Sequence, residues 1–148
     1  MARRAAEIAG RRPYQVARLL DFGFAGELLR LRSARVTGIP LWRLIAAREL
    51  APAPALALAG ELERALRRWR VEGFVHGDLS PRNILVARER PELAVPWFID
   101  WTVDLSSFAG TPRFAGREVF QGHRSFASDR YAIEEILCIL LGLVREHR

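Results

Sequence analysis

Residues 76–86, HGDLSPRNILV, contain the side chains of this chain that are best suited to chemistry. Asp78 offers a carboxylate, and Asn83, five residues later, offers an amide oxygen at the start of an expected strand. Asp100 ends the next expected strand, so a two-stranded hairpin would return it to Asn83. Such oxygens suit Mg²⁺, which keeps several waters and takes its other ligands from phosphates. Phosphoryl transfer requires a carboxylate that accepts a hydroxyl proton beside such a metal. Asp78 is therefore the candidate base, and Asn83 and Asp100 are the candidate magnesium ligands.

His76 is the second candidate catalytic residue of this stretch, because it lies two residues before Asp78. It would either transfer a proton or brace the loop by hydrogen bonding, and bracing is the interpretation that we favour. A plainer hypothesis treats the whole stretch as a polar loop in which Asp78 is a cap and Asn83 satisfies local backbone groups.

Length and composition favour a single globular domain that has no lysine. The chain has 148 residues and a formal charge of +6, and all 23 basic residues are arginine. No mechanism can therefore use an ammonium side chain of this chain. The positive charge suits a phosphate-bearing ligand or an acidic partner, whereas the scattered arginines argue against a nucleic-acid surface.

The two ends of the chain predict a cytoplasmic protein without a membrane span. Residues 1–12 are basic but contain no sustained apolar stretch, so they are not a secretory signal. The apolar segment 131–144 carries Glu134 and Glu135 and is too short to cross a bilayer comfortably.

The elements that would position the candidate residues are predicted to alternate between helices and hairpins. Before the central stretch we expect a helix at 2–10, a hairpin of strands 14–24 and 27–36, a short helix at 40–50, a stiff proline-rich connector at 51–55, and an amphipathic helix from 56 to 69 that ends near Gly73. After it we expect strands 84–87 and 95–100 around a polar turn at 88–92, a turn-rich segment 102–118, and a capped helix 128–144, apolar on nearly every face and hence buried. This order predicts an α+β fold.

Four motifs resemble those of protein kinases. HGDLSPRNILV resembles the catalytic loop H-R-D-L-x-x-x-N, and its HGDLS wording is closer to RIO-type, aminoglycoside and lipopolysaccharide kinases. FIDW, at 98–101, occupies the place of D-F-G. GTPRFAGRE, at 110–118, resembles the close of an activation segment, with Glu118 as its glutamate. SDRYAIEEILCILL, at 128–141, is similar to the central buried helix, and Asp129 stands where the family's aspartate anchors the catalytic loop.

The resemblance continues upstream and implies ATP and Mg²⁺ as cofactors. VARLLDFGF, at 16–24, and ELLRLRSARVTGIPLWRLI, at 27–45, resemble the last two strands of the small lobe, the hinge and the first helix of the large lobe. Backbone groups of the hinge would then face adenine; these residues are Ser33, Ala34, Arg35 and Val36. The alternative is a purely structural hairpin. Arg82 is the nearest candidate for a phosphate contact, with a solvated surface role as its alternative.

The sequence also departs from the family pattern. The glycine-rich strand pair and the strand lysine of a complete kinase have no counterpart in it, so we expect one truncated domain. In this domain residues 1–36 are a reduced two-stranded N-lobe, and residues 37–148 are a mostly helical, partial C-lobe with the catalytic hairpin. Ser80 stands where many protein kinases carry a lysine, and Glu118 has Arg117 or Arg124 as possible partners.

Three functions follow from the resemblance. The first is a minimal phosphotransferase that moves the γ-phosphate of ATP to a hydroxyl, with Ser or Thr of a protein as the acceptor that GTPRFAGRE favours. The second is a pseudokinase or regulatory binding module without turnover. The third, favoured by HGDLS and FIDW, is a small-molecule or lipopolysaccharide sugar kinase.

The reduced N-lobe also predicts a partner. Its apolar side chains would be partly uncovered, which suits an activating protein or a second copy of the chain; they are Leu19, Phe22, Phe24 and Leu28.

Overall fold

The structure is a computed structural model of the chain, and it describes residues 1–90, 93–102, 104–105 and 110–143. Its elements are, in chain order, α1 (Ala2–Ala9), β1 (Leu19–Ala25), β2 (Leu28–Ser33), β3 (Ile39–Pro40), α2 (Leu41–Ala47), α3 (Pro52–Glu72), β4 (Ile84–Arg90), β5 (Leu93–Phe98), two 3₁₀ turns at Pro112–Phe114 and Val119–Gln121, and α4 (Phe126–Leu140). The α+β prediction is confirmed.

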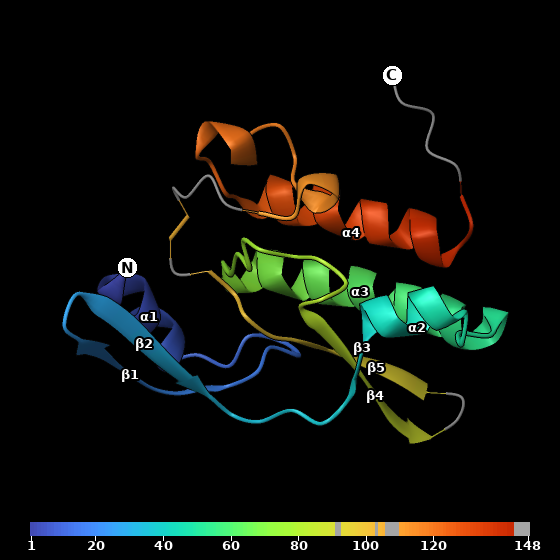
Figure 1. The fold of residues 1–148 in the computed structure, drawn as a ribbon, viewed down its shortest axis with the longest axis horizontal. Helices are drawn as coiled ribbons and strands as arrows, with labels where there is room; N and C mark the ends of the chain where they lie inside the picture. The colour runs from blue at the N-terminus through green and yellow to red at the C-terminus, as the bar shows by residue number, and fades with distance from the viewer. Residues whose placement is uncertain (91–92, 103, 106–109, 144–148) are drawn as a thin grey trace.

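β1 and β2 form the predicted antiparallel hairpin, which lies with α1 at one end of the molecule (Figure 1). Gly26 turns the chain between them in a left-handed conformation, with φ of +61°. Phe24 and Leu28 are 64% and 71% exposed, as expected. Leu19 is only 4% exposed, so the expectation that it is uncovered was wrong. It lies at the start of β1, which packs against α1, and it belongs to the main hydrophobic core.

A second, three-stranded antiparallel sheet has the order β3-β4-β5 and contains the expected hairpin. Ile84 pairs with Phe98, and both side chains are buried on one face of the sheet. Because side chains alternate along a strand, Asn83, Leu85 and Ala87 lie on the opposite face. Pro91 and Glu92 of the predicted turn lie outside the described residues.

The segment before β1 was predicted as part of a strand, but it makes only a short parallel bridge to β5. Val16 is the bridging residue opposite Phe98. The N–H of Phe98 donates to the carbonyl of Gln15, and the N–H of Ala17 donates to the carbonyl of Phe98, both at 2.8 Å. These bonds fix the N-terminal segment to the hairpin that carries Asn83.

The expected connector at 51–55 is wrong, because α3 already begins at Pro52. Proline is tolerated in the first helical turn, where its missing N–H would have no partner inside the helix. The predicted end is confirmed, since Gly73 terminates α3 in a left-handed conformation with φ of +63°. Leu58, Leu62 and Trp69 form the buried face of the helix, as its apolar spacing predicted.

α4 begins at Phe126, two residues before the predicted Ser128. Ser125 is its N-cap and accepts from the N–H of Ala127, while the Ser128 hydroxyl accepts from the N–H of Ser125. This reciprocal cap satisfies backbone donors that a helix start leaves open. The helix is buried along one face rather than all round, and it ends at Leu140; Val144, where it was predicted to end, lies outside the described residues.

α3 lies between the three-stranded sheet and α4 (Figure 1). Trp69 occupies the centre of this arrangement, with its ring centroid 4.5 Å from that of Phe98 and 5.3 Å from that of Phe74. The indole N–H donates to the carbonyl of Tyr14 at 2.9 Å, so the largest core side chain has no unsatisfied polar group. In the described part of the chain, no helix is both long and apolar enough to cross a membrane.

Candidate active site

His76 is a buried bracket of the loop that carries Asp78. Its ring is fully buried and is stacked against Trp69 at 6.0 Å. Nδ1 accepts from the N–H of Asp78 at 3.3 Å, so Nε2 carries the proton and donates to the carbonyl of Ile99 at 2.9 Å. Burial lowers the pKa of His76 to about 3, although the hydrogen bond to Ile99 opposes this shift. A histidine that stays neutral at pH 7 and has both nitrogens bonded favours bracing over proton transfer.

Asp129 anchors the same loop from the first turn of α4. Its carboxylate accepts from the N–H of His76 at 2.6 Å and from the N–H of Gly77 at 2.8 Å. Burial raises the pKa of Asp129 to about 7, while these two hydrogen bonds oppose the rise by favouring the carboxylate. The position of Asp129 therefore agrees with the anchoring role that the sequence suggested.

Asp78, Asn83 and Asp100 are brought together by the loop and the β4–β5 hairpin. The Asn83 amide nitrogen donates to the carbonyl of Asp78 at 2.8 Å and to its carboxylate at 3.2 Å. The N–H of Ile99 donates to the carbonyl of Asn83 at 2.9 Å, which places Asp100 just beyond the end of Asn83's strand. The N–H of Thr102 is bonded to the carbonyl of His76 at 2.9 Å, so the chain is held on both sides of Asp100.

The electrostatics of Asp78 show that these groups are close enough to interact. Partial burial raises the pKa of the Asp78 carboxyl, and the negative charge of Asp100 raises it further. Arg124 and the hydrogen bond from Asn83 oppose the rise. Asp78 is thus a half-buried carboxylate between a cation and an amide donor.

The residues present fit a magnesium ion whose remaining ligands would be phosphate oxygens and waters. Both hydrogen bonds of the Asn83 side chain use its nitrogen, so the amide oxygen faces away from Asp78. Asp100 is exposed and has a left-handed backbone, with φ of +55°. The described residues contain no cluster of three His, Cys, Asp or Glu side chains that could hold a metal without other ligands. One or two protein oxygens with phosphate and water ligands are what Mg²⁺ commonly uses.

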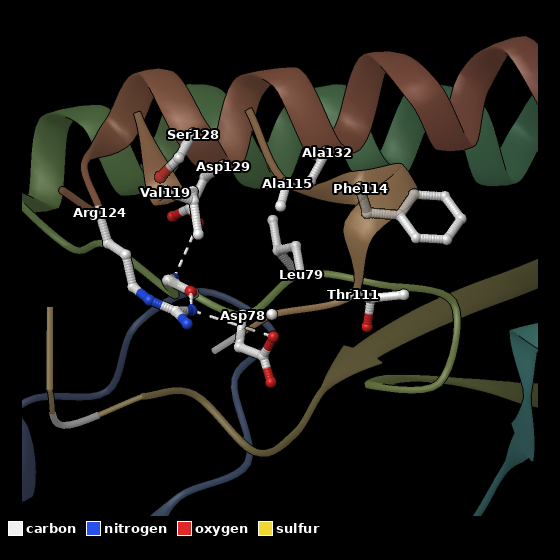
Figure 2. A pocket seen from close by; sticks show the side chains of 12 residues that line it. Asp78, Leu79, Thr111, Phe114, Ala115, Val119, Arg124, Ser128, Asp129 and Ala132 are labelled. Carbon is white, nitrogen blue, oxygen red and sulfur yellow. Dashed lines mark hydrogen bonds and ion pairs between the residues drawn. The ribbon is translucent and has the colours of Figure 1, made fainter. Parts of the chain in front are cut away.

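Two arginines contact this loop, although no sequence pattern predicted that they would. From α1, Arg4 donates to the carbonyls of Val75 and Thr102 and thereby joins the start of the loop to the segment after Asp100. Burial lowers the pKa of Arg4. From the segment before α4, Arg124 reaches the carbonyl of Gly77 and the carboxylate of Asp78 (Figure 2). Neither arginine differs by any sequence signal from the solvated arginines around it.

Gly77 permits the close packing of the loop. Its φ is +80°, a region that favours glycine. A Cβ at this position would lie 2.4 Å from Cγ2 of Thr102 and 3.1 Å from a methyl group of Leu105. The loop that carries Asp78 and the segment after Asp100 can therefore lie this close only with glycine at position 77.

The predicted nucleotide-contacting residues fall into two groups. Ala34, Arg35 and Val36 line a pocket of about 520 Å³, together with residues 12–16, Arg18, Thr37, Ala87 and Trp97. Neither Ser33 nor Arg82 lines it. The guanidinium of Arg82 instead lies 5.7 Å from the ring centre of Trp42, at the start of α2. A pocket of this size is in the usual range for small ligands.

Glu118 stands at the end of the turn that precedes the second 3₁₀ segment. Its carbonyl accepts from the N–H groups of Gln121 and His123, and its carboxylate folds back over Gly116. Among the described residues, neither Arg117 nor Arg124 forms an ion pair with Glu118. Arg124 contacts the loop that carries Asp78 instead.

Comparison with known structures identifies the architecture. The chain matches 651 chains of solved structures, among them the crystal structure of Rad53 residues 1–466 in complex with AMP-PNP. That match has a TM-score of 0.72 and 22% sequence identity, and it covers 97% of this chain and 37% of the Rad53 chain. The chain has a protein-kinase-like fold. No protein-family model and no curated protein sequence matches it.

The match confirms the predicted protein-kinase-like fold. The chain spans a little over a third of the Rad53 chain, so the match establishes the arrangement of elements around Asp78 and not the activity of the larger protein.

Proposed function

We propose that the chain is a kinase-like phosphotransferase, which transfers the γ-phosphate of ATP to a hydroxyl, with Ser or Thr of a protein as the acceptor. The observation that carries this proposal is the convergence of Asp78, Asn83 and Asp100 on one braced loop. Burial raises the pKa of the Asp78 carboxyl and Asp100 adds to the rise; carboxyl groups with a perturbed pKa are frequent at functional sites.

Each side chain of the group has one role. Asp78 orients the attacking hydroxyl and accepts its proton. The amide oxygen of Asn83 and the carboxylate of Asp100 would hold Mg²⁺, which would supply positive charge to neutralise the phosphates. His76 and Asp129 keep the loop in place and stay out of the proton transfer.

The nucleotide base is assigned to the pocket beside Ala34, Arg35 and Val36. Ala87, part of the pocket wall, lies on the same face of β4 as Asn83, four residues away, which is about 13 Å along a strand. ATP would lie along this face, with its base near Ala87 and its phosphates near Asn83.

The two-lobe division belongs to the same proposal. Residues 1–36, with α1 and the β1–β2 hairpin, act as a reduced N-lobe, and residues 37–148 act as a partial C-lobe with the catalytic hairpin.

A second candidate function is a regulatory module that binds without turnover. The observation that favours it is the absence of lysine, because no ammonium group of this chain can contact the phosphates. A small-molecule or sugar acceptor is the remaining alternative for an active enzyme, since the HGDLS and FIDW wording favours it over a protein acceptor.

Calorimetric titration with ATP, in the presence and absence of Mg²⁺, tests the nucleotide site. We expect weak binding that requires Mg²⁺ and that is lost in Asp100→Asn. Asp104→Asn is the matched control, because it changes a carboxylate in the same segment that has no assigned metal role. Equal binding with and without Mg²⁺ would contradict the roles of Asn83 and Asp100.

A further inference from the structure

Arg124 is a buried cation whose side chain reaches the loop of Asp78 from the segment before α4. It lies between the second 3₁₀ turn and α4, and its side chain is only 3% exposed. Its own N–H donates to the carbonyl of Leu105 at 3.0 Å, which fixes the backbone from which the side chain projects. A charged side chain is rarely buried without a specific role for its charge.

The guanidinium holds the residue before Asp78 on one side while Asp129 holds it on the other. Nη1 of Arg124 donates to the carbonyl of Gly77, and the N–H of Gly77 donates to Asp129 at 2.8 Å. Arg124 and Asp129 flank the cap of α4, so one short segment fixes both polar groups of Gly77.

The same guanidinium faces the carboxylate of Asp78. Nη1 lies 4.0 Å from Oδ1 of Asp78, while Oδ2 accepts from Asn83 at 3.2 Å. The two carboxylate oxygens thus face different groups from different parts of the chain, Oδ1 an ion-pair partner and Oδ2 a hydrogen-bond donor. Figure 2 shows Arg124 approaching Asp78 from the side of α4.

Arg124 also packs beside residue 77. Its Cδ lies 3.6 Å from the position that a Cβ of residue 77 would take, which is an ordinary van der Waals distance. The hydrogen bond to the Gly77 carbonyl is therefore what links the two residues, which are 47 positions apart in the sequence.

We propose that Arg124 is a positioning residue for phosphoryl transfer, which orients the Asp78 carboxylate and fixes the Gly77 peptide. This inference rests on the proposed function. With so little of its side chain exposed, Arg124 acts through Asp78 and Gly77 and does not touch the substrate. Orientation of the base matters because a displacement of about 1 Å in a reacting group costs about 100-fold in rate.

The test is a graded series at position 124 in the full chain. We expect Arg124→Gln to lower kcat for transfer from ATP by about 10- to 100-fold, with KM for ATP changed little. Arg124→Lys should fall between Arg124→Gln and the wild type, because an ammonium group keeps the charge but lacks the guanidinium fork. Arg130→Gln is the control, because it removes an exposed arginine of α4 that pairs with Glu134.

Amide hydrogen exchange of the loop supplies a readout that does not depend on activity. We expect Gly77 and Asp78 to exchange faster in Arg124→Gln than in the wild type, and to be unchanged in Arg130→Gln. If the wild type transfers no phosphate, the proposed function fails, and exchange alone then decides the role of Arg124. Unchanged kcat and unchanged exchange in Arg124→Gln would overturn the inference. Should that variant not fold, the same two results in Arg124→Lys would overturn it.

Discussion

Replacing Gly77 by alanine should destabilise the fold through one identifiable contact. The new methyl group would lie 2.4 Å from Cγ2 of Thr102. Thr102 cannot easily turn away, because its hydroxyl accepts from the N–H of Asp104 at 3.1 Å. The left-handed backbone costs an alanine about 1–2 kcal/mol, and overpacking adds about 1–3 kcal/mol. We therefore expect Gly77→Ala to lower the free energy of unfolding by about 2–5 kcal/mol.

Equilibrium urea unfolding with two companion variants separates these contributions. Gly26→Ala carries the same backbone cost, since its φ is +61°, but its methyl group would meet nothing within 4 Å. Thr102→Ser removes Cγ2 and keeps the hydroxyl, so in the Gly77→Ala background it should restore part of the lost stability. If Gly77→Ala loses no more than Gly26→Ala, or if Thr102→Ser restores nothing, the packing assigned to Gly77 is wrong.

Two further predictions concern pH and assembly. The pKa of His76 is lowered to about 3 in the folded protein, from a value near 6.5 in the unfolded chain. The neutral imidazole therefore stabilises the fold fully above pH 6.5, and this contribution is lost as the pH falls. The difference in free energy of unfolding between wild type and His76→Gln should shrink by about 2 kcal/mol between pH 6.5 and 5. The raised pKa of Asp129 has the opposite effect on the pH dependence of stability, but Asp129 is present in both proteins, so its effect cancels in the comparison. If the stability difference between the two proteins does not vary with pH, the buried neutral imidazole is contradicted. Phe24 and Leu28 are exposed on the β1–β2 hairpin, so we expect the chain to self-associate and Phe24→Glu to weaken this association. Light scattering that shows a strict monomer at all concentrations would count against a homodimer.

The parts that the sequence predicted correctly depend on local patterns. The Gly26 turn, the end of α3 at Gly73 and the pairing of β4 with β5 each follow from residues within a few positions of one another. The convergence of Asn83 and Asp100 is such a case too, because a hairpin returns its second strand to the first.

The parts that were missed depend on distance along the chain or on context. Arg4 and Arg124 contact the loop from 71 and 47 residues away, and nothing in a row of arginines reveals which of them become buried. Pro52 and Pro54 read as a connector because proline usually ends a helix, yet in the first turn it is tolerated. Leu19 was expected to be exposed because the packing of α1 on β1 has no local signal.

Transfer of radiolabelled phosphate from ATP to generic protein acceptors, in wild type and in Asp78→Asn, tests the proposed function most directly. Asp78→Asn keeps the size of the side chain, so unfolding curves should confirm that the fold survives. We expect Mg²⁺-dependent transfer by the wild type and none by Asp78→Asn. Transfer that survives in Asp78→Asn would show that Asp78 is not the base, and no transfer by the wild type would leave a binding module in place of an enzyme.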